Sequence, residues 1–225
     1  MIKGKILIRE VKGYRKLSES VYNNLRELII NKDIKDGERL LLNELACSMN
    51  VSVTPLREAL NKLEKEGLVT SIPHKGCIVV SLNIEDIIEI YDIREGLETM
   101  AVRLICQKID KSTLKKLENI CGNSEKFIKK NDIYSYQKYN AEFHDLLIKT
   151  AQNKRLIKIM DELKGQLSVI ISKTLPFSRR IIEYSNEHRE IIQTLKIGDS
   201  NAAENIMHKH IRTAKEDILE DIGSK

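Results

Sequence analysis

The sequence has few proline, glycine and aromatic residues. Its 225 residues include three Pro, ten Gly, seven Tyr, three Phe and no Trp. Together with 41% hydrophobic and 32% charged residues, this is typical of a largely helical globular protein and excludes collagen-like and disordered chains. Platforms that stack single-stranded bases need aromatic rings, so any nucleic-acid partner is expected to be a duplex. The length leaves one large domain or two modest domains open.

Long apolar runs and paired cysteines are also missing. The uncharged stretch from Gly165 to Ser172 is far shorter than the roughly 18 residues of a membrane-spanning helix. Residues 1–9 are too interrupted by charge for a signal-peptide core, so we expect a cytoplasmic protein with no membrane partner. The cysteines at 47, 77, 106 and 121 form no Cys-x-x-Cys pair, which favours buried reduced thiols over disulfides or a thiolate zinc site.

The net charge of +5 is concentrated in the first third of the chain. Residues 1–82 carry 14 Lys and Arg against 10 Asp and Glu, or +4, whereas the rest carries 24 against 23, or +1. This excess fits attraction to a polyanion, although a solvated surface is an alternative explanation.

The pattern of apolar residues predicts a mainly α protein in two parts. Over residues 1–82 it indicates a helix from Leu17, a helix over 42–49, a third helix over 53–66 that Ser52 caps and Gly67 ends, and a hairpin with strands at 68–72 and 77–80. This order is that of a winged helix-turn-helix domain, with residues 1–13 as a flexible arm. Residues 83–225 predict an all-α helical bundle of six helices, with breaks near 109–110, 131–132, 152–153, 175–176 and 198–199.

Three residues at the start of the third helix are candidates for DNA contact. Ser52 and Thr54 lie beside unpaired backbone N–H groups that suit a phosphate, and Arg57 can read guanine in the major groove. His74 and Lys75, at the predicted hairpin tip, could reach the adjacent backbone or minor groove. The alternative is that Arg57 is an ordinary exposed helix charge.

The same region resembles the DNA-binding domain of GntR-family repressors over about residues 17–80. The resemblance is carried by Asp36 to Leu40, Leu45-Ala46, Val51 to Leu60 and Leu63 to Val69. The family usually has Glu at position 42 and often Arg at positions 43 and 53, where this chain has Leu42, Asn43 and Val53. The resemblance therefore implies that Asn43, Ser52, Thr54, Arg57 and the hairpin contact an operator.

Three of the five histidines lie on apolar helix faces in the second part. These are His144, His188 and His210, whereas His208 shares a face with charged residues and is expected to face water. His188 is ten residues before Gly198 and His210 twelve after it, so an antiparallel helix pair would bring them to the same height. With Asn140 one turn before His144, they form a candidate site for a divalent metal such as zinc or nickel. Hydrogen-bonded core histidines are the alternative.

These residues also resemble the FCD effector domain of the FadR-type branch of that family, in its six-helix, VanR-like form. The resemblance is carried by Asn140 to His144, Glu187 to Ile192 with Gly198-Asp199, Ala203 to Ile211, and Arg94 with Glu98. It implies that His144, His188, His210 and Asn140 hold a metal that helps to bind a small organic acid. The first ligand is often Asp in the family, and here it is the neutral Asn140. Arg94 would bind the acid's carboxylate; a surface ion pair with Glu98 is the other interpretation.

We therefore expect a ligand-responsive transcription regulator and not an enzyme: a homodimeric repressor on a roughly palindromic operator. The rival hypothesis is a metal-dependent hydrolase that uses the three histidines, with Glu142 or Glu187 as the base. No His-Glu-x-x-His helix, phosphate-binding glycine loop or nucleophile elbow supports that rival. A nonspecific DNA-coating protein would need more positive charge than +5.

Overall fold

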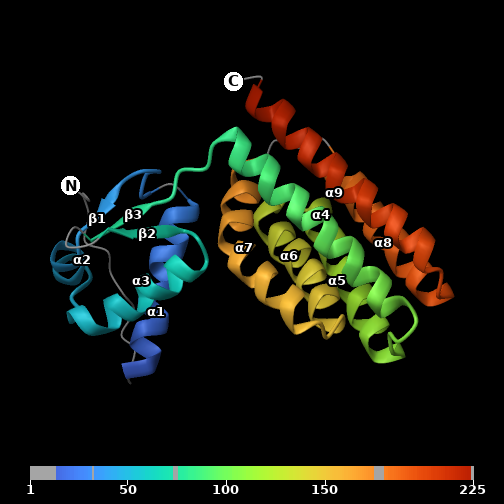
Figure 1. Ribbon diagram of the computed structural model, residues 1–225, viewed down its shortest axis with the longest axis horizontal. Coiled ribbons are helices and arrows are strands. Elements are labelled where there is room, and N and C mark those ends of the chain that lie inside the picture. The colour runs from blue at the N-terminus through green and yellow to red at the C-terminus, as the bar shows by residue number, and fades with distance from the viewer. Residues whose placement is uncertain (1–13, 32, 73–75, 175–179, 224–225) are drawn as a thin grey trace. The chain divides into compact units, whose positions relative to one another are not determined.

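The computed structural model describes residues 14–31, 33–72, 76–174 and 180–223 (Figure 1). The predicted arm, residues 1–13, and the hairpin residues His74 and Lys75 lie outside the described residues. The chain divides into two compact units. The N-terminal unit comprises the described residues up to Asn83 together with Asp161–Val169, and the C-terminal unit comprises Ile84–Met160 together with the described residues from Ile170 onward.

The N-terminal unit has the predicted order of elements. Its helices and strands are α1 (Tyr14–Ile30), β1 (Arg39–Leu40), α2 (Leu42–Met49), α3 (Val53–Lys65), β2 (Val69–Ile72) and β3 (Gly76–Val79). The bounds of α2 agree with the prediction, and α3 ends one residue early. The core of this unit is aliphatic, with Leu25, Leu56 and Leu63 fully buried. Each such side chain contributes roughly 1.5–3 kcal/mol by its removal from water.

The sheet of this unit has one strand more than the sequence predicts. All three strands are antiparallel in the order β1-β3-β2, and Leu40 of β1 pairs with Cys77 of β3. A strand of two residues is too short for a period-2 pattern to show it. The sheet therefore joins the entrance of α2 to the hairpin.

The turn between α2 and α3 is set by its backbone conformation. Asn50 takes the left-handed conformation, with φ of 53°, and Ser52 is the extended N-cap of α3. Ser52 is therefore the N-cap of α3 as predicted, although its side chain makes no capping hydrogen bond. Gly67 follows α3 with φ of 67°, a conformation that glycine adopts at no steric cost.

Gly76 is the residue of the hairpin that should tolerate a side chain least. Its φ is 84°, and an added Cβ would lie 2.4 Å from the backbone oxygen of Leu40. We expect Gly76→Ala to lower the free energy of unfolding by about 2–3 kcal/mol, through left-handed strain and the clash together. Gly37→Ala is the matched control, because Gly37 has φ of 75° and no atom of the described residues lies within 4 Å of its added Cβ. Urea unfolding should show a smaller loss for Gly37→Ala, and equal losses would exclude the clash.

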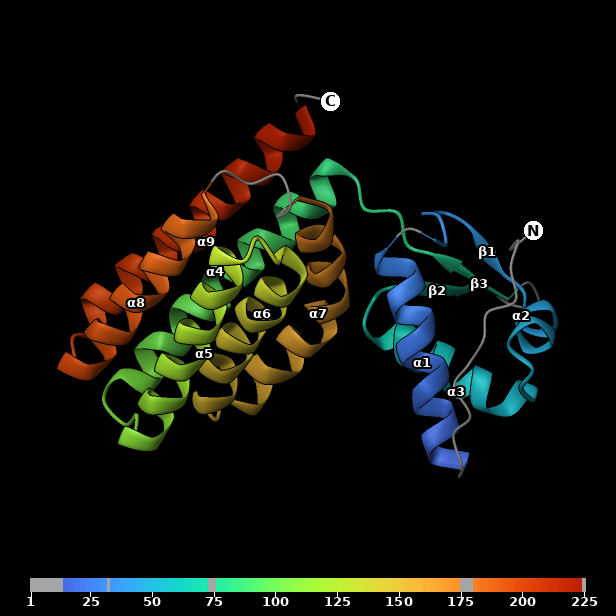
Figure 2. The ribbon, with the colours of Figure 1, turned by 180° about the vertical axis from the view of Figure 1, so that it is seen from behind.

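Six helices of the described chain follow Asn83, as predicted. They are α4 (Ile84–Cys106), α5 (Lys111–Lys129), α6 (Ile133–Thr150), α7 (Lys154–Thr174), α8 (Ile181–Ile197) and α9 (Ser200–Gly223). Within the C-terminal unit α4 packs against α9, α6 and α8, and Figure 2 shows α8 and α9 side by side. The mainly α fold class is therefore confirmed. Within the described ranges, no helix is both long and apolar enough to span a membrane.

Candidate functional site

The N-terminal unit presents at its surface the predicted DNA-contacting residues of α2, of α3 and of the turn between them. Asn43, Ser52, Thr54 and Arg57 are not buried, and Asn43 and Arg57 line one hollow formed by α2, α3 and the hairpin strands. Arg57 makes no hydrogen bond or ion pair with another described residue, so its guanidinium has no partner there that would compete with a base or phosphate. That these residues contact DNA stays a prediction.

The three histidines of the C-terminal unit converge as their helical spacing predicts. His144 comes from α6, His188 from α8 and His210 from α9, and one nitrogen of each lies within 4.8 Å of the others. The Nε2 atoms of His188 and His210 are 3.2 Å apart. All three residues are buried, whereas the side chain of His208 is 49% exposed and pairs with Glu95.

Two buried carboxylates orient this cluster. Nδ1 of His144 bonds to Glu98 of α4, and Nδ1 of His210 lies 2.7 Å from an oxygen of Glu187. An ionised carboxylate only accepts hydrogen bonds, so each Nδ1 carries a proton, and in the neutral ring the other nitrogen, Nε2, presents a lone pair. This is the arrangement in which a carboxylate fixes the tautomer and ring orientation of a metal-binding histidine.

Burial keeps the imidazoles of His144 and His188 neutral. Desolvation lowers the pKa of His144 to about 4, although Glu98 opposes the shift. Desolvation and the other two histidines also place the pKa of His188 well below its usual value. Burial would raise the pKa of Glu98, but His144 and Arg94 lower it to about 2. At neutral pH His144 and His188 are therefore uncharged, and His144 lies beside the ionised carboxylate of Glu98.

This pattern predicts that the metal-free protein loses stability between pH 7 and pH 5. The folded-state pKa values of His144 and His188 lie below the unfolded value of 6.5, so the unfolded state binds more protons as the pH falls through this range. We expect a loss of about 2–4 kcal/mol in urea unfolding with a chelator present. The loss through Glu98 begins only below its unfolded pKa of 4.5.

The comparison of two single variants tests this prediction. His188→Gln should flatten the dependence of stability on pH, and His208→Gln, at an exposed position outside the cluster, is the control. Equal stability of the unsubstituted chain at pH 7 and pH 5 would contradict the neutral, buried assignment.

The donor set fits a divalent metal. Nε2 of His144 is buried and has no hydrogen-bond partner among the described residues, although an unsatisfied buried polar atom costs roughly 1–3 kcal/mol. Three imidazole nitrogens that face one another match the ligand preference of zinc and nickel. The alternative, that the three histidines are hydrogen-bonded core residues, does not explain why Nε2 of His144 lacks a partner in the described structure.

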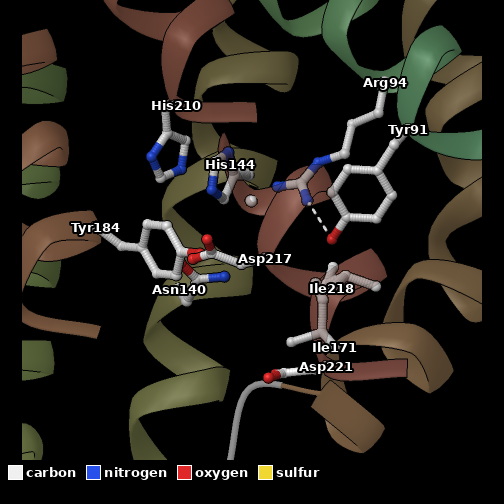
Figure 3. A pocket seen from close by; sticks show the side chains of 11 residues that line it. Tyr91, Arg94, Asn140, His144, Ile171, Tyr184, His210, Asp217, Ile218 and Asp221 are labelled. Atoms are coloured by element: carbon white, nitrogen blue, oxygen red, sulfur yellow. Dashed lines mark hydrogen bonds between the residues drawn. The ribbon is translucent and has the colours of Figure 1, made fainter. Parts of the chain in front are cut away.

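A pocket opens beside the cluster within the C-terminal unit. His144 and His210 line it with Asn140, which comes from the same face of α6 as His144 (Figure 3). The other lining residues belong to four helices: Tyr91, Arg94, Ile171, Tyr184, Ala214, Asp217, Ile218 and Asp221. The space between these atoms is about 450 Å³, part of it open to solvent.

Arg94 lines this pocket, and the structure bears on both interpretations of its role, an ion pair with Glu98 and the binding of a carboxylate. Its Nε is 2.6 Å from Glu98, so the expected i,i+4 ion pair exists. The pair is buried, with Arg94 4% and Glu98 1% exposed, so the expectation of a surface pair is wrong. Arg94 also donates to the hydroxyl of Tyr91 at 3.2 Å and lines the pocket. Its binding of an effector carboxylate stays a prediction.

Sequence analysis did not identify the roles of several residues of the site. The roles of Glu98 and Glu187 as Nδ1 partners were not predicted, and neither was Asp217 in the pocket wall. Asp217 follows His210 by seven residues, two helical turns, which is a signal that could have placed it on the same face of α9. The contact of Glu98 with His144 joins residues 46 apart and leaves no such signal.

The carboxylates that a hydrolase would need as a base are not placed for that role. Glu142 is exposed and does not line the pocket. Glu187 is bonded to His210. The geometry therefore gives the hydrolase hypothesis no support.

Each of the two units matches a model of a known protein family. Residues 17–79 match the model of the gntR family of bacterial regulatory proteins, and residues 89–213 match that of the FCD domain. The uncharacterized HTH-type transcriptional regulator YdhC of Bacillus subtilis is 31% identical over 199 residues, which are 88% of this chain and 84% of the relative. The gluconate operon transcriptional repressor of the same species is 25% identical over 229 residues, 99% and 93% of the two chains.

A solved structure supports the fold. The E. coli protein McbR/YncC superposes with a TM-score of 0.76 and 20% identity, over 91% of this chain and 97% of that chain. At this identity the likeness concerns the fold alone.

Proposed function

Since the chain belongs to the gntR family of bacterial regulatory proteins and carries an FCD domain, we propose that it represses transcription from an operator in double-stranded DNA and that a small carboxylate effector changes this binding. Such a regulator acts where bacterial DNA is, in the cytoplasm. The relatives named as repressors include those of a gluconate operon and of a probable D-xylose utilization operon. Their sugars are not carried over to this chain.

The DNA-binding half of the proposal is supported by the exposed start of α3. Arg57 offers a planar fork of donors that matches the two acceptors of guanine, and Ser52 and Thr54 lie beside the first N–H groups of the helix. Asn43 lines the same hollow as Arg57, which supports its assignment as a further contact.

The effector half of the proposal is supported by one observation. His144, whose buried Nε2 has no hydrogen-bond partner in the described part of the chain, lines the same pocket as Arg94. A zinc or nickel ion held by His144, His188 and His210 with Asn140 would supply a positive charge that attracts a carboxylate. Arg94 orients that carboxylate with its planar donors. Tyr91 holds Arg94 in place through its hydroxyl.

Regulation then follows from linkage. An effector that binds the DNA-competent and DNA-incompetent forms unequally shifts their populations by the difference in its binding free energies. DNA must change the affinity for the effector by the same factor. We propose release of DNA on effector binding.

We propose a homodimer as the working form. A palindromic operator is read by two recognition helices related by a two-fold axis. The C-terminal unit offers a face for a second copy on α4, where Ile93 and Met100 are 47% and 39% exposed. Sedimentation should give the mass of two chains, and the mass of one would contradict the dimer.

A gel-shift experiment tests the function directly. The metal-loaded chain should bind the DNA upstream of its own coding region more tightly than a scrambled duplex of equal length, and C5 carboxylates, used as probes, should weaken that binding. Equal affinity for both duplexes, or a loss of affinity with salt that is the same for both, would indicate a nonspecific DNA-coating protein.

A further inference from the structure

Asn140 is the one predicted ligand of the metal site that is not a histidine. It lies one helical turn before His144 on α6, and the two residues line the pocket together with His210 (Figure 3). The Asn140 side chain makes no hydrogen bond or ion pair with another described residue, so its amide oxygen is available to a ligand. The charge of this donor therefore bears on what the pocket binds.

The four predicted donors carry no negative charge. A metal ion binds the lone pair of a neutral imidazole, and an amide is neutral as well. His144, His188 and His210 would therefore, together with Asn140, leave both positive charges of a divalent ion in place. A carboxylate at any of these four positions would offset one of the two charges.

The buried charged residues beside the donors offset only part of this charge. Glu98 bonds to His144, and Glu187 bonds to His210. Arg94 is paired with Glu98, so one of these two carboxylates is already neutralised. A loaded site would thus keep one net positive charge, in the same pocket that Arg94 lines.

The two aspartates of the pocket wall have interactions of their own. Asp217 lies 3.6 Å from Arg180 and accepts a hydrogen bond from Tyr184. Asp221 also has a partner in the described structure. A buried charge without a counter-charge is costly, so the loaded pocket favours the entry of one anionic group.

We infer that the neutral side chain of Asn140 makes the binding of the metal and of a single carboxylate group cooperative, so that each raises the affinity for the other. The inference rests on the proposed effector role of this pocket and names the residue that ties the effector to the metal. Linkage requires the same factor in both directions. An aspartate at position 140 would take the place of the effector's charge and remove the cooperativity.

Zinc affinity measured with and without a carboxylate tests the inference. A competing chelator sets the free zinc concentration for the full chain, and pentanoate is compared with the neutral pentanamide at equal ionic strength. Pentanoate should raise the zinc affinity about tenfold, and pentanamide should leave it unchanged. Asn140→Asp should bind zinc about tenfold more tightly without carboxylate, and pentanoate should then change that affinity by less than about threefold.

Asn201→Asp is the matched control. It makes the same isosteric change of charge at an exposed position of α9 that does not line the pocket. This variant should behave as the unsubstituted chain does. If Asn140→Asp binds zinc no more tightly than Asn201→Asp, Asn140 does not act on the metal, and the inference is wrong.

The other outcomes separate this inference from the proposed function. If pentanoate raises the zinc affinity equally in the unsubstituted chain and in Asn140→Asp, the inference is wrong, whereas the proposed effector site stands. If pentanoate leaves the zinc affinity of the unsubstituted chain unchanged, the inference is also wrong, and the gel shift with pentanoate decides the proposed function separately. If the chain binds no zinc, the proposed metal site fails, and the inference fails with it.

Discussion

Arg94→Met is expected to lower the free energy of unfolding by about 3–5 kcal/mol, the cost of removing one partner from a buried ion pair. Arg94 and Glu98 are 4% and 1% exposed, and their atoms approach to 2.6 Å. Methionine fills much of the space but leaves the Glu98 carboxylate without its guanidinium, bonded to a neutral His144. The pKa of Glu98, which His144 and Arg94 together lower, should then rise.

Two further variants distinguish charge from packing in this experiment. Arg94→Met combined with Glu98→Gln should recover part of the lost stability, because the buried amide carries no charge. Arg103→Met, on the same helix, should cost less than about 1 kcal/mol, since Arg103 is 54% exposed and pairs with Glu204 at 3.8 Å. A double variant no more stable than the single variant, in urea unfolding at neutral pH, would contradict the charge explanation.

Arg57→Ala is expected to weaken operator binding by about 1–3 kcal/mol, or roughly 5- to 150-fold, if the side chain reads a base. The thermal midpoint should change little, because Arg57 is exposed and has no ion pair within the described residues. The loss should be larger for the operator than for a scrambled duplex, since a base contact carries sequence information and a phosphate contact does not.

Arg155→Ala is the matched control for Arg57→Ala. Arg155 is an exposed arginine of the C-terminal unit, so its removal changes the net charge by the same amount. Fluorescence anisotropy at fixed salt measures both variants. Unchanged operator affinity of Arg57→Ala would show that α3 is not the recognition helix.

Much of the fold could be predicted because its signals are local. The apolar spacing of α2 and α3 and the glycine after α3 place these helices within one residue of their observed bounds. Strand β1 was missed because its two residues are defined by pairing with β3, more than 35 residues later. Pairing at that separation leaves no trace in the local pattern.

In the candidate site, too, the features with a local signal could be predicted and the others could not. The meeting of His188 and His210 follows from their distances to the turn at Gly198, which is helix geometry. The burial of Arg94 and Glu98 does not follow from helix geometry, because it arises when α9, α6 and α8 cover α4. Apolar periodicity indicates which face of a helix is covered only when that face is apolar.

The metal content of the purified chain tests the central claim most directly. Elemental analysis should find about one zinc or nickel ion per chain, and His208→Ala should keep it, because His208 is exposed and outside the cluster. His144→Ala, His188→Ala and His210→Ala should each lose most of the metal. Equal metal content in all five proteins would show that the three converging histidines are packing residues and not ligands.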